Sequence, residues 1–327
     1  MASGDDIPYQ LRPNKFIDRQ IFLEALTKVV PQKQHGQYVY ISMGGKHLVD
    51  QEAVYRKIGI RNLYSFDGSA DIVARQNCNR PHFSSLCEEL HSSALAGELD
   101  RILKHFKPAE HLIVWLDYTN AERLAQLQEF GEVLKRCQPG DVVRITMNAN
   151  DGTLRGDWKK EGCAGPAEYR AKRLRDQLGD FFPAGVEAIG DNGIPAVLSE
   201  AVSIVSASAS EVSYQQFVPI LLTSYADGQR MFTAAVLCLS QSGELPDGLN
   251  GWEFLAKGWS KVTEISVPDL SIREKVAIDK HLSKGPAAII KAVKFQPSGE
   301  LDNAQRALRS YKLLHRFYPT FHAIGVQ

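Results

Sequence analysis

Two adjacent glycines and one carboxylate are the residues in this chain whose spacing best suits chemistry. Gly44 and Gly45 follow the apolar run 38–43, and Asp67 follows the apolar run 62–66. Glycines let the backbone pass close to a ligand, and a carboxylate after the next strand can accept hydrogen bonds from both ribose hydroxyls. The pattern predicts a site for a nucleoside-bearing cofactor. A plain strand-to-helix turn and an Asp-Gly turn are the alternative interpretations.

A second group of polar residues follows the most apolar run, 111–116. Asp117 could position an acceptor or act as a base, and Tyr118 could stack on a planar substrate or form a hydrogen bond to it. Thr119 or Asn120 also suits a helix N-cap, and both roles can coexist. Glu88, with its neighbour Glu89, follows a shorter apolar stretch, where an acid could contact an adenine amino group or simply begin a solvated helix.

The positions of these residues depend on strands and helices that alternate along the chain. Strand-like runs at 38–43, 62–66, 111–116 and 141–147, with a short one near 82–86, are separated by helical segments at 47–58, 69–77, 92–106 and 121–136, and a further helix over 16–30 precedes the first strand. Such alternation predicts a mostly parallel sheet with right-handed crossovers. Open sheets of this kind bind ligands outside the carboxyl ends of their strands.

The second half of the chain has a different pattern. A basic helix is expected at 167–178, another helix at 195–206, and two strands at 212–225 and 230–239 around an Asp-Gly turn that could close the sheet as antiparallel edge strands. Ser271 and Glu274 form a capping box for a helix, and helices follow at 286–293 and 302–316.

The predicted fold is therefore α/β, with a Rossmann-like, doubly wound, mostly parallel sheet carrying an antiparallel edge strand, plus a helical C-terminal region. Residues 1–245 are expected to form the sheet domain, with an N-terminal helix behind a loose leader at 1–14. Residues 246–327 are expected to form the mainly helical C-terminal region.

Composition excludes several classes of function. Lys and Arg total 38, as do Asp and Glu, so no global charge favours nucleic acid or a membrane. No apolar run approaches the ~20 residues that span a bilayer, and the polar N-terminus lacks a signal-peptide core. Five scattered cysteines without a Cys-x-x-Cys pair, and histidines without ligand spacing, predict a cytoplasmic protein with reduced thiols and no metal site.

Several short motifs between residues 11 and 150 resemble those of class I S-adenosylmethionine-dependent methyltransferases. More narrowly, they are similar to a bacterial family that carries the name Putative O-methyltransferase. The most specific are Trp-x-Asp-Tyr-Thr at 115–119, Gly-Asp-x-Val-Arg-Ile-Thr at 140–146 and Arg-Gln-Asn at 75–77. Leu-Arg-Pro-Asn-Lys at 11–15, with Asp18, Arg19 and Phe22, also matches. The glycine loop departs from the usual acid followed by Gly-x-Gly.

The resemblance implies that S-adenosylmethionine is the cofactor, held by Gly44, Gly45, Asp67 and Glu88, with Asp117 and Tyr118 beside the acceptor. The acceptor stays open between a small-molecule hydroxyl, a modified base and a protein side chain. One alternative is a non-catalytic protein whose degenerate cofactor site binds a partner or senses a nucleotide. Another is an NAD-linked oxidoreductase, which would lack a reversed final strand. Nucleic-acid contact through the basic residues at 170–175 is the weaker interpretation of that helix.

Overall fold

The computed structural model describes residues 12–319, which form two compact units. The larger unit contains Phe22–Ser224 and Gln229–Thr263. The smaller unit groups the described parts of Met1–Ile21, Tyr225–Gly228 and Glu264–Gln327. Residues 1–11 of the expected leader, Leu11 of the first motif included, lie outside the described residues. The domain boundary expected after residue 245 stays a prediction.

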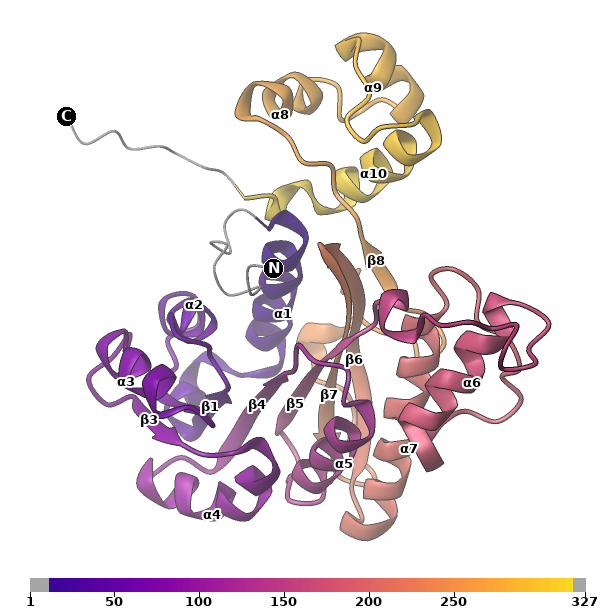
Figure 1. Cartoon of the computed structure of the whole chain (residues 1–327). Coiled ribbons are helices and arrows are strands. Elements are labelled where there is room, and N and C mark those ends of the chain that lie inside the picture. Colours follow the sequence, from indigo (N-terminus) through magenta and orange to yellow (C-terminus); the bar gives the residue numbers. More distant parts are fainter. Residues whose placement is uncertain (1–11, 320–327) are drawn as a thin grey trace. The chain divides into compact units, whose positions relative to one another are not determined.

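The larger unit alternates strands and helices as the sequence predicts. Its elements are α1 (Pro13–Val29, of which residues 22–29 belong here), β1 (Tyr38–Ser42), α2 (Val49–Lys57), β2 (Asn62–Asp67), α3 (Ala70–Cys78), β3 (Leu86–Glu89), α4 (Leu95–His105), β4 (His111–Asp117), α5 (Arg123–Leu134), β5 (Val142–Asn148), α6 (Pro166–Leu178), α7 (Ile194–Ser213), β6 (Gln216–Asp227, of which residues 216–224 belong here) and β7 (Gln229–Leu239). Figure 1 shows them coloured along the chain.

The strands form one sheet in the order β3-β2-β1-β4-β5-β7-β6-β8, where β8 is Thr263–Ile265. The pairs β1–β2, β2–β3, β1–β4 and β4–β5 are parallel, whereas β7 runs antiparallel to β5. This topology confirms the predicted α/β class. From β1 the chain adds β2 and β3 on one side of the sheet and then β4 and β5 on the other. The carboxyl ends of β1 and β4 are therefore the topological switch point.

The two faces of the sheet are covered by different helices. Alternate strand residues such as Ile41, Phe66 and Val114 belong to one hydrophobic core with residues of α4, α5 and α7. We call this side the α5 face. On the other side Cys87 of β3 packs with Val73 of α3 and with Leu48, and we call this side the α3 face. Because strand side chains alternate between faces, each polar residue at a strand end belongs to one of them.

Local sequence signals explain where the elements end. Pro31 follows α1, and Gly59, with φ +91°, follows α2 in a conformation that favours glycine. The third strand begins at Leu86, four residues later than expected, because residues 82–85 form a turn closed by the Ser85 amide on the His82 carbonyl. Helix α7 continues to Ser213, so β6 begins at Gln216.

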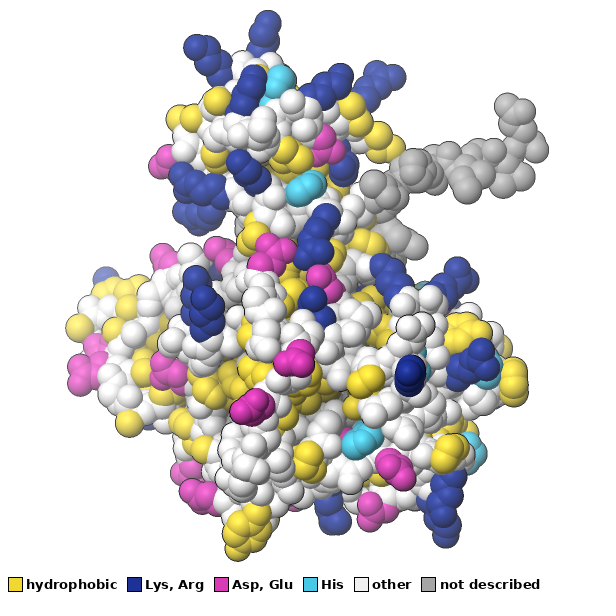
Figure 2. Space-filling model, turned by 180° about the vertical axis from the view of Figure 1, so that it is seen from behind, with side chains coloured by type: hydrophobic (Ala, Val, Ile, Leu, Met, Phe, Trp, Pro, Cys, Tyr) yellow, Lys and Arg dark blue, Asp and Glu magenta, His cyan; other side chains and the backbone are white. Residues whose placement is uncertain are grey.

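The smaller unit contains α8 (Ile272–Asp279), α9 (Pro286–Val293) and α10 (Leu301–Leu314). The Ser271–Glu274 capping box forms as predicted. Asn14 donates to the Asp227 carboxylate at 2.8 Å and accepts from the Val267 amide at 2.9 Å. Figure 2 shows many Lys and Arg side chains on the surface of these helices.

Within residues 12–319, no helix combines the length and hydropathy that crossing a bilayer requires.

Candidate functional site

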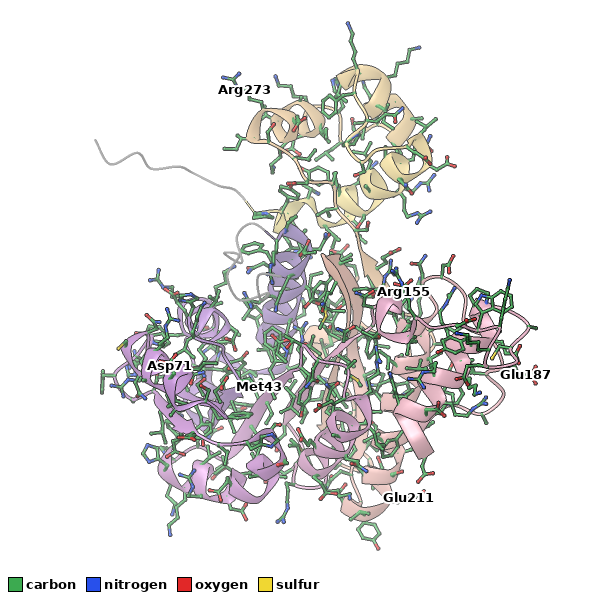
Figure 3. All side chains as sticks on the ribbon, in the orientation of Figure 1. Met43, Asp71, Arg155, Glu187, Glu211 and Arg273 are labelled. Carbon is green, nitrogen blue, oxygen red and sulfur yellow. The ribbon has the colours of Figure 1, made fainter. Side chains whose placement is uncertain are left out.

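The loop after β1 places two glycines with different surroundings at the switch point. Gly44 has φ +66°, and a Cβ there would lie 2.6 Å from Leu48 Cδ2 and 2.7 Å from Ser65 Oγ. Gly45 has φ +54°, and a Cβ there would meet nothing within 4 Å. The loop is therefore tightly packed at Gly44 and open at Gly45. Figure 3 labels Met43, which begins this loop.

Side chains at the C-terminal end of α3 form hydrogen bonds to the glycine loop. The amide nitrogen of the fully buried Gln76 donates to the carbonyls of Met43 (2.9 Å) and Gly45 (3.2 Å), and Asn79 donates to the Lys46 carbonyl at 2.8 Å. These bonds bind the loop carbonyls to α3. The Arg-Gln-Asn motif at 75–77 therefore contributes its glutamine to bracing the loop.

Two acids stand side by side at the ends of β2 and β3. Asp67 pairs in register with Glu89, so both side chains lie on the α3 face, as does Ser65. Asp67 Oδ1 accepts from the Ser69 amide at 2.9 Å, as an Asp-Gly turn would. Glu89 is exposed and forms no side-chain hydrogen bond or ion pair among the described residues. The carboxylate of Glu89 is therefore available to a ligand.

Glu88 points to the opposite face of the sheet. Its carboxylate accepts from the Tyr64 hydroxyl at 2.8 Å and pairs with Arg101 of α4 at 2.5 Å. The Arg101 hydrogen bond, with a smaller contribution from Tyr64, lowers the pKa of Glu88. This carboxylate is engaged within the protein, so a role for Glu88 in cofactor binding stays a prediction that its neighbour Glu89 fits better.

Asp117, the last residue of β4, and Tyr118, the residue after it, lie on opposite faces of the sheet. Asp117 pairs in register with Thr146 and lies on the α3 face, where Trp115 Nε1 donates to Thr146 Oγ1 at 2.9 Å. Tyr118 is buried in the core of the α5 face, and its hydroxyl donates to Glu129 of α5 at 2.5 Å. Burial, followed by this hydrogen bond, raises the pKa of Tyr118. The acceptor role predicted for Tyr118 stays a prediction.

A fully buried arginine, which the sequence did not single out, supports the segment after Asp117. Arg123 begins α5 and donates twice to the Asn148 carbonyl, at 2.9 Å and 2.6 Å. Asn148 in turn donates to the Thr119 carbonyl at 3.1 Å. Burial lowers the pKa of Arg123 to about 10, which leaves it charged at neutral pH. Arg123 thus fixes the ends of β4 and β5 to each other.

The motif residues Trp115 and Arg144 form a buried cluster beneath this edge. The Arg144 guanidinium lies 4.3 Å from the Trp115 ring and 4.4 Å from the Phe22 ring. Its Nη2 donates to Thr233 Oγ1 at 3.2 Å. A guanidinium packed over two aromatic rings that meet edge-on ties α1, β4, β5 and β7 together. The most specific sequence motifs therefore stabilise the sheet that carries the site.

The edge as a whole offers a glycine loop and three acids on one face. Asp67, Glu89 and Asp117 all lie on the α3 face at the carboxyl ends of their strands. Asp71 of α3, labelled in Figure 3, adds an exposed carboxylate to the first turn of the following helix. Within the described part of the chain, no three His, Cys, Asp or Glu side chains are placed to hold a metal ion.

Comparison with known proteins gives one family. The model described as "Putative O-methyltransferase" matches residues 7–326. No curated protein matches the chain in sequence.

Solved structures similar to this chain include the N-methyltransferase NodS from Bradyrhizobium japonicum. It has 11% identity and a TM-score of 0.38, over 71% of this chain and 98% of that one. An O-methyltransferase from Bacillus cereus in complex with SAH has 13% identity and a TM-score of 0.38, over 72% and 84%. The family match covers nearly the whole chain, so the protein belongs to the family of O-methyltransferases that this model describes, and methyl transfer is the activity of that family.

Proposed function

We propose that the protein transfers the methyl group of S-adenosylmethionine to an acceptor hydroxyl at the switch point between β1 and β4. The observation that carries the proposal is the convergence of an open glycine with three acids on one face of the sheet, at the edge where open sheets bind ligands. Each acid comes from a different strand, and the loop between them is braced by buried hydrogen bonds.

The donor half of the site consists of the glycine loop and the β2 and β3 acids. Gly45 fits close approach of a ligand, because its missing side chain faces open space. Gly44 helps to place the loop, because the absence of a side chain lets Leu48 and Ser65 pack closely against its backbone. Asp67 would bind the ribose hydroxyls, and Glu89, in register beside it, would accept from the adenine amino group.

Charge favours this assignment. When bound, S-adenosylmethionine supplies an electrophilic methyl group on a positively charged sulfur. Asp67, Glu89 and Asp117 place negative charge around the edge where that cation would lie, and opposite charges at short range attract.

The acceptor half of the site depends on Asp117. As the acceptor oxygen gains the methyl group it loses its proton, and the Asp117 carboxylate is the group placed to hold the hydroxyl and receive that proton. Arg123 and Asn148 fix the segment beside it, which favours alignment of the acceptor. Tyr118 would act on Asp117 through the position of the backbone, since its hydroxyl is bound to Glu129.

Calorimetric titration with S-adenosylmethionine and S-adenosylhomocysteine tests the donor half. The native protein should bind both, and Asp67→Asn should weaken both at least tenfold, because ribose hydrogen bonds to a charged group contribute about 1.5–3 kcal/mol. Asp100→Asn, an exposed site on α4, is the matched control and should bind as the native protein does. Equal affinity in the two variants would show that the donor site is elsewhere.

Transfer of a labelled methyl group to a panel of phenols, nucleosides and peptides tests the acceptor half. We expect label on a hydroxyl oxygen. Asp117→Asn should retain binding of S-adenosylhomocysteine and lower kcat by about 10²-fold or more, the usual contribution of a general base. Methylation of nitrogen only would reject the oxygen acceptor and leave the donor assignment intact.

A further inference from the structure

A cavity of about 440 Å³ lies at the amino-terminal edge of the sheet, away from the proposed methyl-transfer site. Asn62 and Leu86, the first residues of β2 and β3, line it together with His105–Lys107 at the end of α4. The glycine loop and the acids stand at the carboxyl ends of the same strands. None of the residues assigned to methyl transfer lines this cavity.

Positive charge lines the cavity. Arg80 and Lys107 contribute their charges to its wall beside the imidazole ring of His105, and among the described residues that line it none is acidic. Arg80 is fixed in place, because Nε donates to the Asn77 carbonyl at 3.2 Å and Nη1 to the Ser85 carbonyl at 3.1 Å. In the part of the chain that the structure describes, neither Arg80 nor Lys107 forms an ion pair. Their charge is available to an anion.

An aromatic side chain stands at the same cavity with its ring in solvent. Phe83 is 87% exposed, the most exposed large hydrophobic side chain among the described residues. Its ring centroid lies 4.2 Å from that of His82, which lies 5.3 Å from that of Tyr55. His82 is in turn held by Ser84, with 2.6 Å between Nδ1 and Oγ. Phe83 thus contacts the His82 ring and is otherwise open to solvent.

We propose that this cavity binds a nucleotide, either free or as one unit of a single-stranded nucleic acid. The planar base stacks on Phe83, and the phosphate pairs with Arg80 and Lys107. Exposed aromatic rings combined with cations are the general means of binding unpaired nucleotides. The guanidinium of Arg80 suits phosphate because its planar donors match the oxygens. The site is separate from the donor site proposed above.

Fluorescence anisotropy with three labelled probes tests the proposal: AMP, a single-stranded RNA of about ten nucleotides, and the same RNA as a duplex. Binding of AMP and RNA alike would identify free nucleotides as the source, and binding of the single strand alone would identify nucleic acid. Phe83→Ala should weaken binding about fivefold or more, the lower range of one lost base stack. Lys107→Gln should reduce the salt dependence of RNA binding by about one phosphate contact.

Two controls match these variants. Tyr214→Ala removes another exposed aromatic ring, and Lys257→Gln another exposed cation, and both should bind as the native protein does. Binding of S-adenosylhomocysteine should be unchanged in all four variants, which separates this site from the donor site. The proposal would be overturned if no probe bound, if the duplex bound as well as the single strand, or if Phe83→Ala bound like Tyr214→Ala.

Discussion

The two edges of the same sheet differ in charge and in construction. The carboxyl edge carries Asp67, Glu89 and Asp117 around a glycine loop, whereas the amino edge carries Arg80 and Lys107 beside an exposed phenylalanine. With a formal net charge of zero, the chain as a whole shows neither feature. The comparison teaches that the sign of the local charge decides which ligand an edge of the sheet can attract. That sign depends on which strand ends lie side by side.

The edges also differ in what supports them. At the carboxyl edge a buried glutamine, a buried arginine and a close-packed glycine hold the backbone in place. At the amino edge the main features are side chains in solvent. Mutations of these supports at the carboxyl edge should therefore change folding and binding together, and mutations of the solvent-exposed side chains at the amino edge should change binding alone.

The largest effect is expected from Gly44→Ala. Its Cβ would lie within 2.7 Å of Leu48 and Ser65, and φ is positive, so overpacking and backbone strain should together lower the free energy of unfolding by about 2–4 kcal/mol. Gly45→Ala, which meets open space, should lose only about 1 kcal/mol. Urea unfolding of both variants measures the difference. Equal losses would mean that the loop is not packed as described.

Gln76→Ala should have the next largest effect. It leaves the carbonyls of Met43 and Gly45 without their buried donor, which should cost about 1–3 kcal/mol in unfolding free energy. The loosened loop should also weaken S-adenosylhomocysteine binding in calorimetry. Asn77→Ala is the control, because Asn77 donates to Val73 within α3. If Gln76→Ala lost stability without losing affinity, the loop would not be part of the cofactor site.

A smaller, pH-dependent effect is expected at the amino edge. The Asp141 carboxylate, with Oδ1 3.4 Å from His111 Nδ1, raises the pKa of His111 and outweighs partial burial. A raised folded-state pKa contributes stability below the unfolded value of about 6.5, and that stability is lost as pH rises through the higher folded value. Urea unfolding from pH 5.5 to 8.5 should show this decline, and His111→Gln should remove it. A decline that persists in the variant would assign it to another group.

The smallest effect is expected from Phe83→Ala. A side chain that is 87% exposed contributes little to the core, so the unfolding free energy should change by less than about 0.5 kcal/mol. Thermal unfolding of this variant beside Phe66→Ala, a fully buried core position of β2, gives the contrast. A large loss at Phe83 would mean that the ring supports the fold and would remove the distinction between the two edges.

Much of the fold could be predicted because its signals are local. Alternating apolar runs with Gly and Pro boundaries placed β1, β2, β4 and β5 within about two residues, a typical accuracy for strongly periodic segments. The third strand was misplaced because its four residues, Leu86–Glu89, are too few to show a period. The hairpin of β6 and β7 followed from an Asp-Gly turn, since Gly228 has φ +101°.

The site could be predicted only in part. The sequence placed Gly44, Gly45, Asp67 and Asp117 at strand ends, and strand ends of a parallel sheet meet at one edge. It could not separate Glu88 from Glu89, because a shift of one residue moves a side chain to the other face, and only the pairing of β3 with β2 sets that register. Likewise no local pattern shows that the Tyr118 hydroxyl donates to Glu129, which lies on the next helix.

The sequence by itself determined the order of strands and helices and the polar residues that end each strand, because those features depend on neighbours along the chain. Only the tertiary structure decided which acids share a face, that Trp115 and Arg144 hold the sheet together, and that cations and Phe83 gather at the opposite edge. Those features depend on strand register and on contacts between segments far apart in the sequence, and no local pattern records them.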